Sequence, residues 1–174
     1  VKYNSSGTKQ WTKLLGTSSE EAGEGVTVDS SDNIYVTGRA LADLDNNTNS
    51  GGHDILLVKY NSSGTKQWTK LTGTSSRDWA LEVTVDNSSN IYVTGKTYGG
   101  FDGYINGTAA TGYGTDMFLV KYNSSGTKQW TQQLGTSSED TGQGVTVDSS
   151  DNIYVTGWTY GGLDGNTSSG VGDI

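Results

Sequence analysis

Three loops rich in Asp, Asn, Gly and Ser carry side chains of the kind that bind metal ions. In the first loop Asp43, Asp45 and Asn47 alternate with other residues, and Asp54 follows eleven residues after Asp43. Hard cations such as calcium take several carboxylate and carbonyl oxygens from a flexible loop. The pattern is that of an incomplete calcium loop, because it has no Gly at the sixth position and no Glu at the twelfth.

The third loop repeats part of this arrangement, with Asp164, Asn166 and Asp173 at matching offsets. Two interpretations stay open for these oxygens. They bind calcium, or they are ordinary turn residues, since Asp, Asn, Gly and Ser are the residues that turns use. Calcium is the one cofactor that the sequence indicates.

Two tryptophans outside the repeated pattern suit ligand binding. Trp79 is aligned with Gly23 and Gly142 of the other copies, and Trp158 follows a predicted strand. Loops at strand ends often carry binding residues, although single exposed aromatics also occur without a function. The candidates for stacking against a glycan or a surface protein are Trp79, Trp158, Tyr98 and Tyr160.

Groups for acid–base or nucleophilic chemistry are scarce. The chain has no Cys and a single His, His53. This composition excludes a Cys nucleophile and leaves little for a catalytic triad or a zinc site. The acidic segment 20–24 changes from copy to copy, as a solvated surface does. We therefore expect no catalytic residues and no enzyme activity.

The charge balance restricts the partners. Lys and Arg total 11 against 19 Asp and Glu, for a net charge of −8. A nucleic-acid partner is not expected, because binding through phosphates needs a basic surface. No apolar run has the length of a membrane helix, so we expect no membrane span. The acidic, Cys-free composition rich in Ser, Thr, Asn and Gly favours an extracellular or cell-surface location.

Sequons of the type Asn-x-Ser/Thr recur in predicted turns and loops, where a glycan would be exposed. The alternative is that Asn-Ser-Ser is ordinary turn composition. The candidate glycosylation sites are Asn4, Asn46, Asn61, Asn87, Asn106, Asn123 and Asn166.

All of these residues lie on an internal repeat. The motif VKYNSSGTKQWT begins at Val1, Val58 and Val120, and a second motif, GVTVDSSDNIYVTG or a close variant, follows each copy. Self-similarity at a fixed period indicates a repeat architecture. We divide the chain, as one domain, into the repeats 1–57, 58–119 and 120–174.

Each repeat predicts four short strands and no helix. Residues 26–28 alternate, 34–38 follow a tight turn, 55–60 form an apolar run typical of a buried strand, and 66–71 alternate again. Four strands in up-and-down order at this period are typical of a propeller blade. GVTVD would be the innermost strand. KQWTK would be the outermost, where Lys guards an exposed edge.

The two motifs together resemble the bacterial SBBP β-propeller repeat. The residues that carry the resemblance are GVTVDSSDNIYVTG and DILLVKYNSSGTKQWTKL, in phase over the whole chain. The first half is also similar to NHL-type blades, and the Gly-x-x-x-Trp of the second half to quinoprotein-like blades. The resemblance implies an all-β propeller of four-stranded antiparallel blades, and it brings no catalytic motif.

Trp11, Trp68 and Trp130 occupy the same position in each repeat. In quinoprotein-like propellers the equivalent Trp docks between blades, so the resemblance implies a structural, blade-docking role. The alternative is an aromatic platform for sugars.

Three repeats are too few to close a ring, since propellers have four to eight blades. We expect the ring to be completed by further repeats of the same chain or by a second copy. Two copies would give six blades. Because all blade borders are alike, copies could also join into a filament.

These observations predict a non-catalytic extracellular or cell-surface repeat protein that acts as a structural or adhesive scaffold. Two alternatives stay open. One is a propeller module that binds a glycan or a protein with its loop face, and the other is a calcium-stabilised propeller domain of a larger secreted enzyme.

Overall fold

The computed structural model describes residues 1–105, 114–170 and 172–174, and every regular element in these ranges is a β-strand. The abundance of Gly and of β-branched Val, Ile and Thr explains this. No helix in the described part of the chain has the length and apolarity needed to cross a membrane. The strands are β1 (Lys2–Tyr3), β2 (Lys9–Trp11), β3 (Glu21–Val28), β4 (Ile34–Ala40), β5 (Asp54–Tyr60), β6 (Lys66–Thr72), β7 (Asp78–Val85), β8 (Ile91–Thr97), β9 (Asp116–Tyr122), β10 (Lys128–Leu134), β11 (Asp140–Val147) and β12 (Ile153–Thr159).

The strands form two complete blades. Blade A (21–72) has the order β3-β4-β5-β6, and blade B (78–134) has the order β7-β8-β9-β10, both antiparallel throughout. The GVTVD-type strand lies at one edge of each sheet and the KQWT strand at the other. This confirms the predicted strand order and the all-β propeller architecture of four-stranded blades.

A two-stranded sheet flanks the complete blades at each end of the chain. The N-terminal half-blade, β1-β2, consists of the third and fourth strands of a blade. The C-terminal half-blade, β11-β12, consists of the first and second strands. The repeats counted from VKY therefore start inside a third strand, whereas each structural blade begins at the inner strand.

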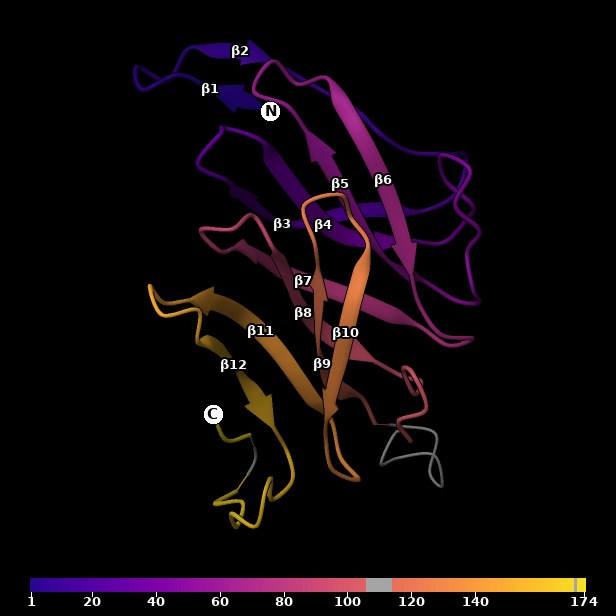
Figure 1. The fold of residues 1–174 in the computed structure, drawn as a ribbon. Coiled ribbons are helices and arrows are strands. Elements are labelled where there is room, and N and C mark those ends of the chain that lie inside the picture. The colour runs from indigo at the N-terminus through magenta and orange to yellow at the C-terminus, as the bar shows by residue number, and fades with distance from the viewer. Residues whose placement is uncertain (106–113, 171) are drawn as a thin grey trace.

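The sheets stack in chain order from the N-terminal half-blade to the C-terminal half-blade, with the two termini at opposite ends of the stack (Figure 1). The inner strands of consecutive sheets lie next to each other, β3 against β7 and β7 against β11. Such packing of blade on blade is that of a propeller, and the ring is not closed within this chain.

The main apolar core lies at the border between blades A and B. Apolar side chains from both sheets meet there because each blade has one face that its neighbour must cover. A T-shaped contact between Phe101 and Phe118, with ring centroids 5.5 Å apart, closes the loop end of this core. The largest fully buried apolar members are Tyr35, Ile55, Leu57, Ile91, Val93, Phe118, Val120 and Tyr122.

The turn between the third and fourth strands is built in the same way in every repeat. In blade A the Oδ1 atom of Asn61 accepts hydrogen bonds from the backbone N–H and hydroxyl of Ser63 (3.1 and 2.7 Å) and from the N–H of Thr65 (2.9 Å). Gly64 closes the turn with a φ of 78°, which favours glycine. Asn4 and Asn123 accept the same set of bonds.

The turn between the first and second strands has its own recurring network. Asp29 accepts hydrogen bonds from the N–H groups of Ser31 and Asn33, from the Asn33 side chain and, at 3.0 Å, from the Tyr35 hydroxyl. Asp86 and Asp148 accept equivalent bonds. The recurring polar residues of the repeat are thus used to hold its turns.

Candidate functional site

The candidate site lies around Trp79, at the loop end of the border between blades A and B. Trp79 is the second residue of β7, as Ala22 is the second residue of β3. The predicted alignment of Trp79 with Gly23 and Gly142 is therefore wrong by one residue, since Gly23 corresponds to Ala80. Small residues around the register shift of these strands make the two alignments look alike in the sequence.

Protein groups surround the Trp79 ring. The guanidinium carbon of Arg39, at the end of β4, lies 5.1 Å from the ring centroid, and the Nζ atom of Lys96, at the end of β8, lies 4.9 Å from it. The rings of His53 and Tyr98 approach edge to face, with centroids 6.0 and 6.2 Å away. Cation–π contacts of this kind stabilise the ring in place, so Trp79 is packed rather than offered to a ligand.

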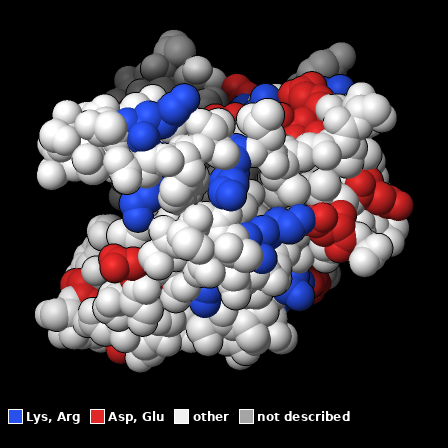
Figure 2. Space-filling model, turned by 90° about the horizontal axis from the view of Figure 1, so that it is seen from above, with Lys and Arg blue, Asp and Glu red and all other residues white. Residues whose placement is uncertain are grey.

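Glutamates from neighbouring segments balance these cations. Arg39 pairs with Glu20 at 3.2 Å and with Glu24 at 2.5 Å, and Lys96 lies 3.9 Å from Glu139. The acidic segment 20–24, expected to be merely solvated, thus holds an arginine. Both signs of charge also occur side by side on the face of the molecule that is seen from above (Figure 2).

His53 lies inside this group of side chains. Its side chain is 12% exposed and its Nε2 atom lies 3.6 Å from a carboxylate oxygen of Glu20. Neither ring nitrogen has a hydrogen-bond partner among the described residues, and the same holds for the indole nitrogen of Trp79. The histidine therefore packs against the ring of Trp79 at the blade border.

Two of the four aromatic candidates, Trp158 and Tyr160, lie elsewhere. Trp158, on β12, has its ring centroid 4.9 Å from that of Tyr160, which is 44% exposed. Trp158 also lines a cavity of about 440 Å³ between β9, β10 and β12, with Met117 and Leu134. The structure therefore brings Trp79 together with Tyr98, and Trp158 with Tyr160, as two separate pairs.

The predicted calcium ligands of the first loop bond to other groups of the protein, within the loop and on β6. Asp43 accepts a hydrogen bond from the N–H of Asn49 at 2.8 Å. Asp45 binds the ammonium group of Lys66 and the hydroxyl of Thr69, and the bond from Lys66 first, then that from Thr69, lowers the pKa of Asp45. Asn47 donates to three backbone carbonyls.

The last residue of this predicted set is buried instead. Asp54 begins β5, is fully buried and accepts a hydrogen bond from the N–H of Ser50 at 2.9 Å. Burial raises the pKa of the Asp54 carboxyl. The bond from Ser50 offsets this only in part, and the negative charge of Asp78 adds to the rise.

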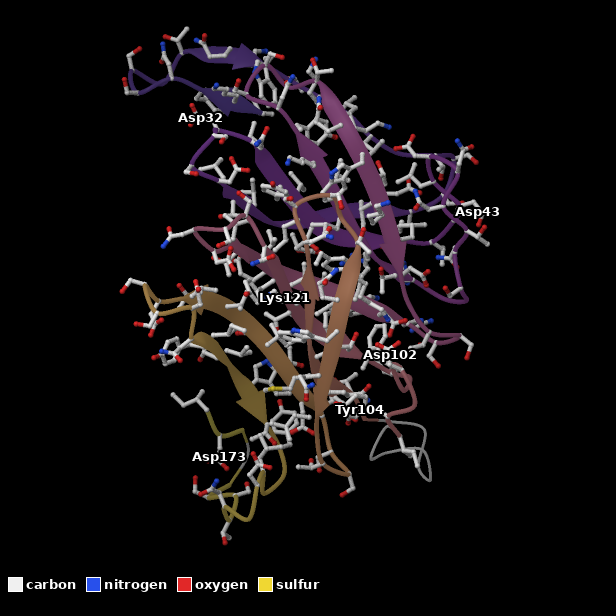
Figure 3. All side chains as sticks on the ribbon, viewed as in Figure 1. Asp32, Asp43, Asp102, Tyr104, Lys121 and Asp173 are labelled. Carbon is white, nitrogen blue, oxygen red and sulfur yellow. The ribbon has the colours of Figure 1, made fainter. Side chains whose placement is uncertain are left out.

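In the third loop the predicted ligands also serve the turn. Asp164 has a φ of 50°, Asn166 donates to the carbonyl of Leu163, and Asp173 accepts bonds from Ser169. Asp43 and Asp173 lie far apart (Figure 3). Within the described ranges, no three His, Cys, Asp or Glu side chains gather into a group that could hold a metal ion.

The repeated tryptophans lie at the borders between sheets. Trp68 of blade A lies against Gly126 of blade B, with its Cη2 atom 3.2 Å from where a Cβ on that glycine would be. Trp11 lies against Gly64 in the same way. Trp130 and Trp68 each contact a tyrosine of their own blade, with ring centroids 6.2 Å apart. Trp11 and Trp68 thus contact the neighbouring sheet, and the blade-docking role stays a prediction.

Six of the seven sequons lie within the described residues, on turns, and their glycosylation stays a prediction. The side chains of Asn4, Asn46, Asn87 and Asn166 are exposed, and those of Asn61 and Asn123 are partly exposed. Asn106 lies outside the described residues.

Two sets of side chains were missed by the sequence analysis. Arg39 and Lys96 hold Trp79, and Asp29 with its equivalents holds the turn and the buried tyrosine hydroxyl. The recurring spacing Asp-x-x-x-Asn-x-Tyr, seen at Asp29, Asn33 and Tyr35, is the signal that predicts the second network.

The comparisons with known proteins agree with this architecture. A family model described as the β-propeller repeat SBBP matches residues 10–45, 67–102 and 129–164, which is more than half of the chain. The chain is also 29% identical over 186 residues to an uncharacterized WD repeat-containing protein of Acanthamoeba polyphaga mimivirus. That alignment covers 87% of this chain and 13% of the viral protein.

Proposed function

Because the chain belongs to the SBBP β-propeller repeat family, we propose that it is a non-catalytic scaffold that acts outside the cell or at its surface. Its role in this proposal is structural or adhesive. The folded blades supply shape and spacing, and no chemical step takes place on them.

The observation that carries the proposal is the identical use of polar side chains in successive repeats. The Oδ1 atoms of Asn4, Asn61 and Asn123 accept the same three hydrogen bonds. A catalytic site needs one blade that differs from the others and presents convergent acid and base groups. Here the residues that recur most strictly hold the turns. Their recurrence therefore favours a structural role over a catalytic one.

The composition supports the proposed location. A net charge of −8 favours solubility outside the cell. The absence of Cys makes the fold independent of the redox state of the compartment. The exposed sequons at Asn4, Asn46 and Asn166 are compatible with glycosylation.

Antibodies against the purified chain test the location. They should label intact cells or particles of the source without permeabilisation, and the purified chain should compete with their attachment to surfaces. Labelling only after permeabilisation would contradict a surface role. An activity that converts a substrate, and that is lost on substitution of one residue, would contradict a non-catalytic role.

A second candidate function is a binding module that uses the loop face. The non-repeated pair of Trp158 and Tyr160 favours it, because Tyr160 is exposed and Trp158 lines a cavity. A glycan array tests it with the unmodified chain, with Trp158→Ala and with the control Tyr104→Ala, whose ring is 38% exposed on another loop. Signals lost only in Trp158→Ala would favour binding over the scaffold role. The alternative of a calcium-stabilised domain in a larger secreted enzyme stays a prediction.

A further inference from the structure

Two aspartates are buried at the border between the two complete blades. Asp54 begins β5 of blade A, Asp78 begins β7 of blade B, and both are 0% exposed. The backbone N–H of Asp78 donates to the carbonyl of His53, the residue before Asp54, at 2.6 Å. The backbone thus joins the two blades at the point where each of them places a carboxyl group in the interior.

Hydrogen bonds within the border satisfy Asp78 more fully than Asp54. Asp78 accepts bonds from the N–H and hydroxyl of Thr74, at 2.6 and 3.0 Å, and from the hydroxyl of Thr97. The Oδ2 atom of Asp54 accepts a bond from the N–H of Ser50 at 2.9 Å. The Oδ1 atom of Asp54 is buried and has no hydrogen-bond partner among the described residues.

Neither carboxyl group has a positively charged partner. In the part of the chain that the structure describes, no Lys, Arg or His forms an ion pair with Asp54 or Asp78. A buried charge without such a partner is costly. The other charged or titratable groups on the adjoining segments, with their partners, are Arg39 (Glu20 and Glu24), His53 (Glu20), Lys96 (Glu139), Glu21 (Thr17), Asp43 (Asn49) and Arg77, which is exposed.

The aspartates of the turns between first and second strands have the opposite environment. Asp86 accepts bonds from the N–H groups of Ser88 and Asn90, from the Asn90 side chain and from the Tyr92 hydroxyl. Burial acts to raise the pKa of Asp86, but these hydrogen bonds together lower it below its ordinary value of 3.8. The pKa of Asp29 is lowered by the equivalent bonds. Folding therefore favours the ionised form of these two turn aspartates.

At the border between the blades the balance has the other sign. Burial raises the pKa of Asp78, and the bonds from Thr97 and Thr74 offset this only in part. Burial also raises the pKa of Asp54, the bonds from Ser50 offset part of the rise, and the negative charge of Asp78 adds to it. Folding therefore favours the protonated form of both border aspartates.

We propose that the border between blades A and B is stabilised by acid, because Asp54 and Asp78 take up protons there while the chain stays folded. Proton uptake removes the cost of two buried negative charges and the repulsion between them. This property goes beyond the proposed scaffold role and does not depend on it.

The two sets of aspartates set the pH at which the chain is most stable. The stability that comes from protonated Asp54 and Asp78 is lost as the pH rises from 3.8 through their raised pKa values. The stability that comes from ionised Asp29 and Asp86 is lost as the pH falls from 3.8 through their lowered pKa values. The folded chain is therefore most stable in mildly acidic solution, at a pH of about 4 to 5.

Urea unfolding of the unmodified chain between pH 3 and pH 7 tests the sign. The ratio of folded to unfolded chain, extrapolated to water, should rise about threefold or more as the pH falls from 7 to about 4.5. It should fall again as the pH falls further, when the turn aspartates take up protons. A ratio at about pH 4.5 that is equal to or lower than the ratio at pH 7 would overturn the proposal.

Two matched variants locate the effect. Asp54→Asn keeps an acceptor for Ser50 but cannot ionise, so its rise in the ratio should be at most about half that of the unmodified chain. Asp32→Asn removes the same charge from an exposed turn position with a φ of 61°, which Asn adopts readily, and should keep the full rise. Equal rises in the two variants would assign the effect to the net charge of −8 and would overturn the role of the border.

Carbon-13 NMR of the Asp carboxyl groups measures the protonation directly. In the folded, unmodified chain the resonances of Asp54 and Asp78 should titrate above pH 3.8, and the former should be missing from the spectrum of Asp54→Asn. Because this titration uses the unmodified chain, it decides the question even where a variant fails to fold. A folded chain in which every Asp carboxyl titrates at or below 3.8 would overturn the proposal.

Discussion

Strands β3 and β7 have the same position in their blades and share the ending Val-Thr-Val, but their surroundings differ. Val26 of β3 is 65% exposed, whereas Val83 of β7 is 3% exposed against blade A. Tyr154 of β12 and Tyr92 of β8 differ in the same way, at 55% and 1%. The apolar face of a blade therefore packs against the neighbouring blade. The same residue stabilises the fold only where that neighbour is present.

The largest expected effect separates the two valines. Val83→Asp places an unpaired charge in the core and should cost at least about 3 kcal/mol of unfolding free energy. Val26→Asp should change the unfolding free energy by less than about 0.5 kcal/mol, because Val26 is exposed. Urea unfolding followed by tryptophan fluorescence measures both changes in unfolding free energy. Equal losses would mean that the border of β3 is covered in the single chain.

The tyrosine hydroxyls give a smaller and sharper comparison. Tyr92 and Tyr154 each donate a 3.0 Å hydrogen bond to the aspartate of their turn, the first buried and the second exposed. Tyr92→Phe leaves a buried carboxylate oxygen of Asp86 with one bond fewer and should cost about 1 kcal/mol. Tyr154→Phe should cost a few tenths of this, roughly 0.3 kcal/mol. The same urea titration checks both, and a larger loss for Tyr154→Phe contradicts the ranking by burial.

Two equivalent aspartates have opposite pKa shifts, which predicts opposite pH dependence. Burial raises the pKa of Asp54 above its ordinary value of 3.8, whereas hydrogen bonds from Ser169 and Ser168 lower the pKa of Asp173. In the folded chain the ionised form of Asp54 is disfavoured, so it costs stability as the pH rises from 3.8 through the raised pKa. Asp173 contributes stability above pH 3.8 and loses it as the pH falls through its lowered pKa.

Asp54→Asn should therefore stabilise the chain at pH 7, by about 1 kcal/mol or less, and should change little at pH 3. Asp173→Asn should slightly destabilise it at pH 7. Urea midpoints measured between pH 3 and pH 7 give the two differences. A gain for Asp54→Asn that is independent of pH would point to a hydrogen-bond effect and not to burial of charge.

Calcium gives the smallest expected effect. Asp45 is held by Lys66 and Thr69, and Asp43 and Asp173 lie far apart. Addition of calcium to metal-free chain should therefore shift the melting temperature by less than about 1 °C, since ligand stabilisation follows the occupancy of a folded-state site. A rise of about 5 °C or more would show that the loop oxygens rearrange around the ion, and the variant Asp43→Asn would then identify the loop.

Much of the fold could be predicted because its signals are local. The apolar run at 55–60 predicts a buried strand, and β5 is buried over most of its length. The Asn-Ser-Ser-Gly segment predicts the turn that Asn61 and Gly64 form. The site was predicted less well, since the contacts of Trp79 with Arg39 and Lys96 join three strands from two blades.

Alternation, turn residues and the recurrence of two motifs were enough to specify four strands per blade, their order and the type of turn between them, because each depends on residues close together in the chain. The burial of Val83 and Asp54, the exposure of Val26, the partial exposure of Asp173 and the placement of Trp79 between two cations appear only in three dimensions. The physical reason is that these residues become buried only where a neighbouring blade covers them. The sequence of one repeat does not show which of its faces has such a neighbour.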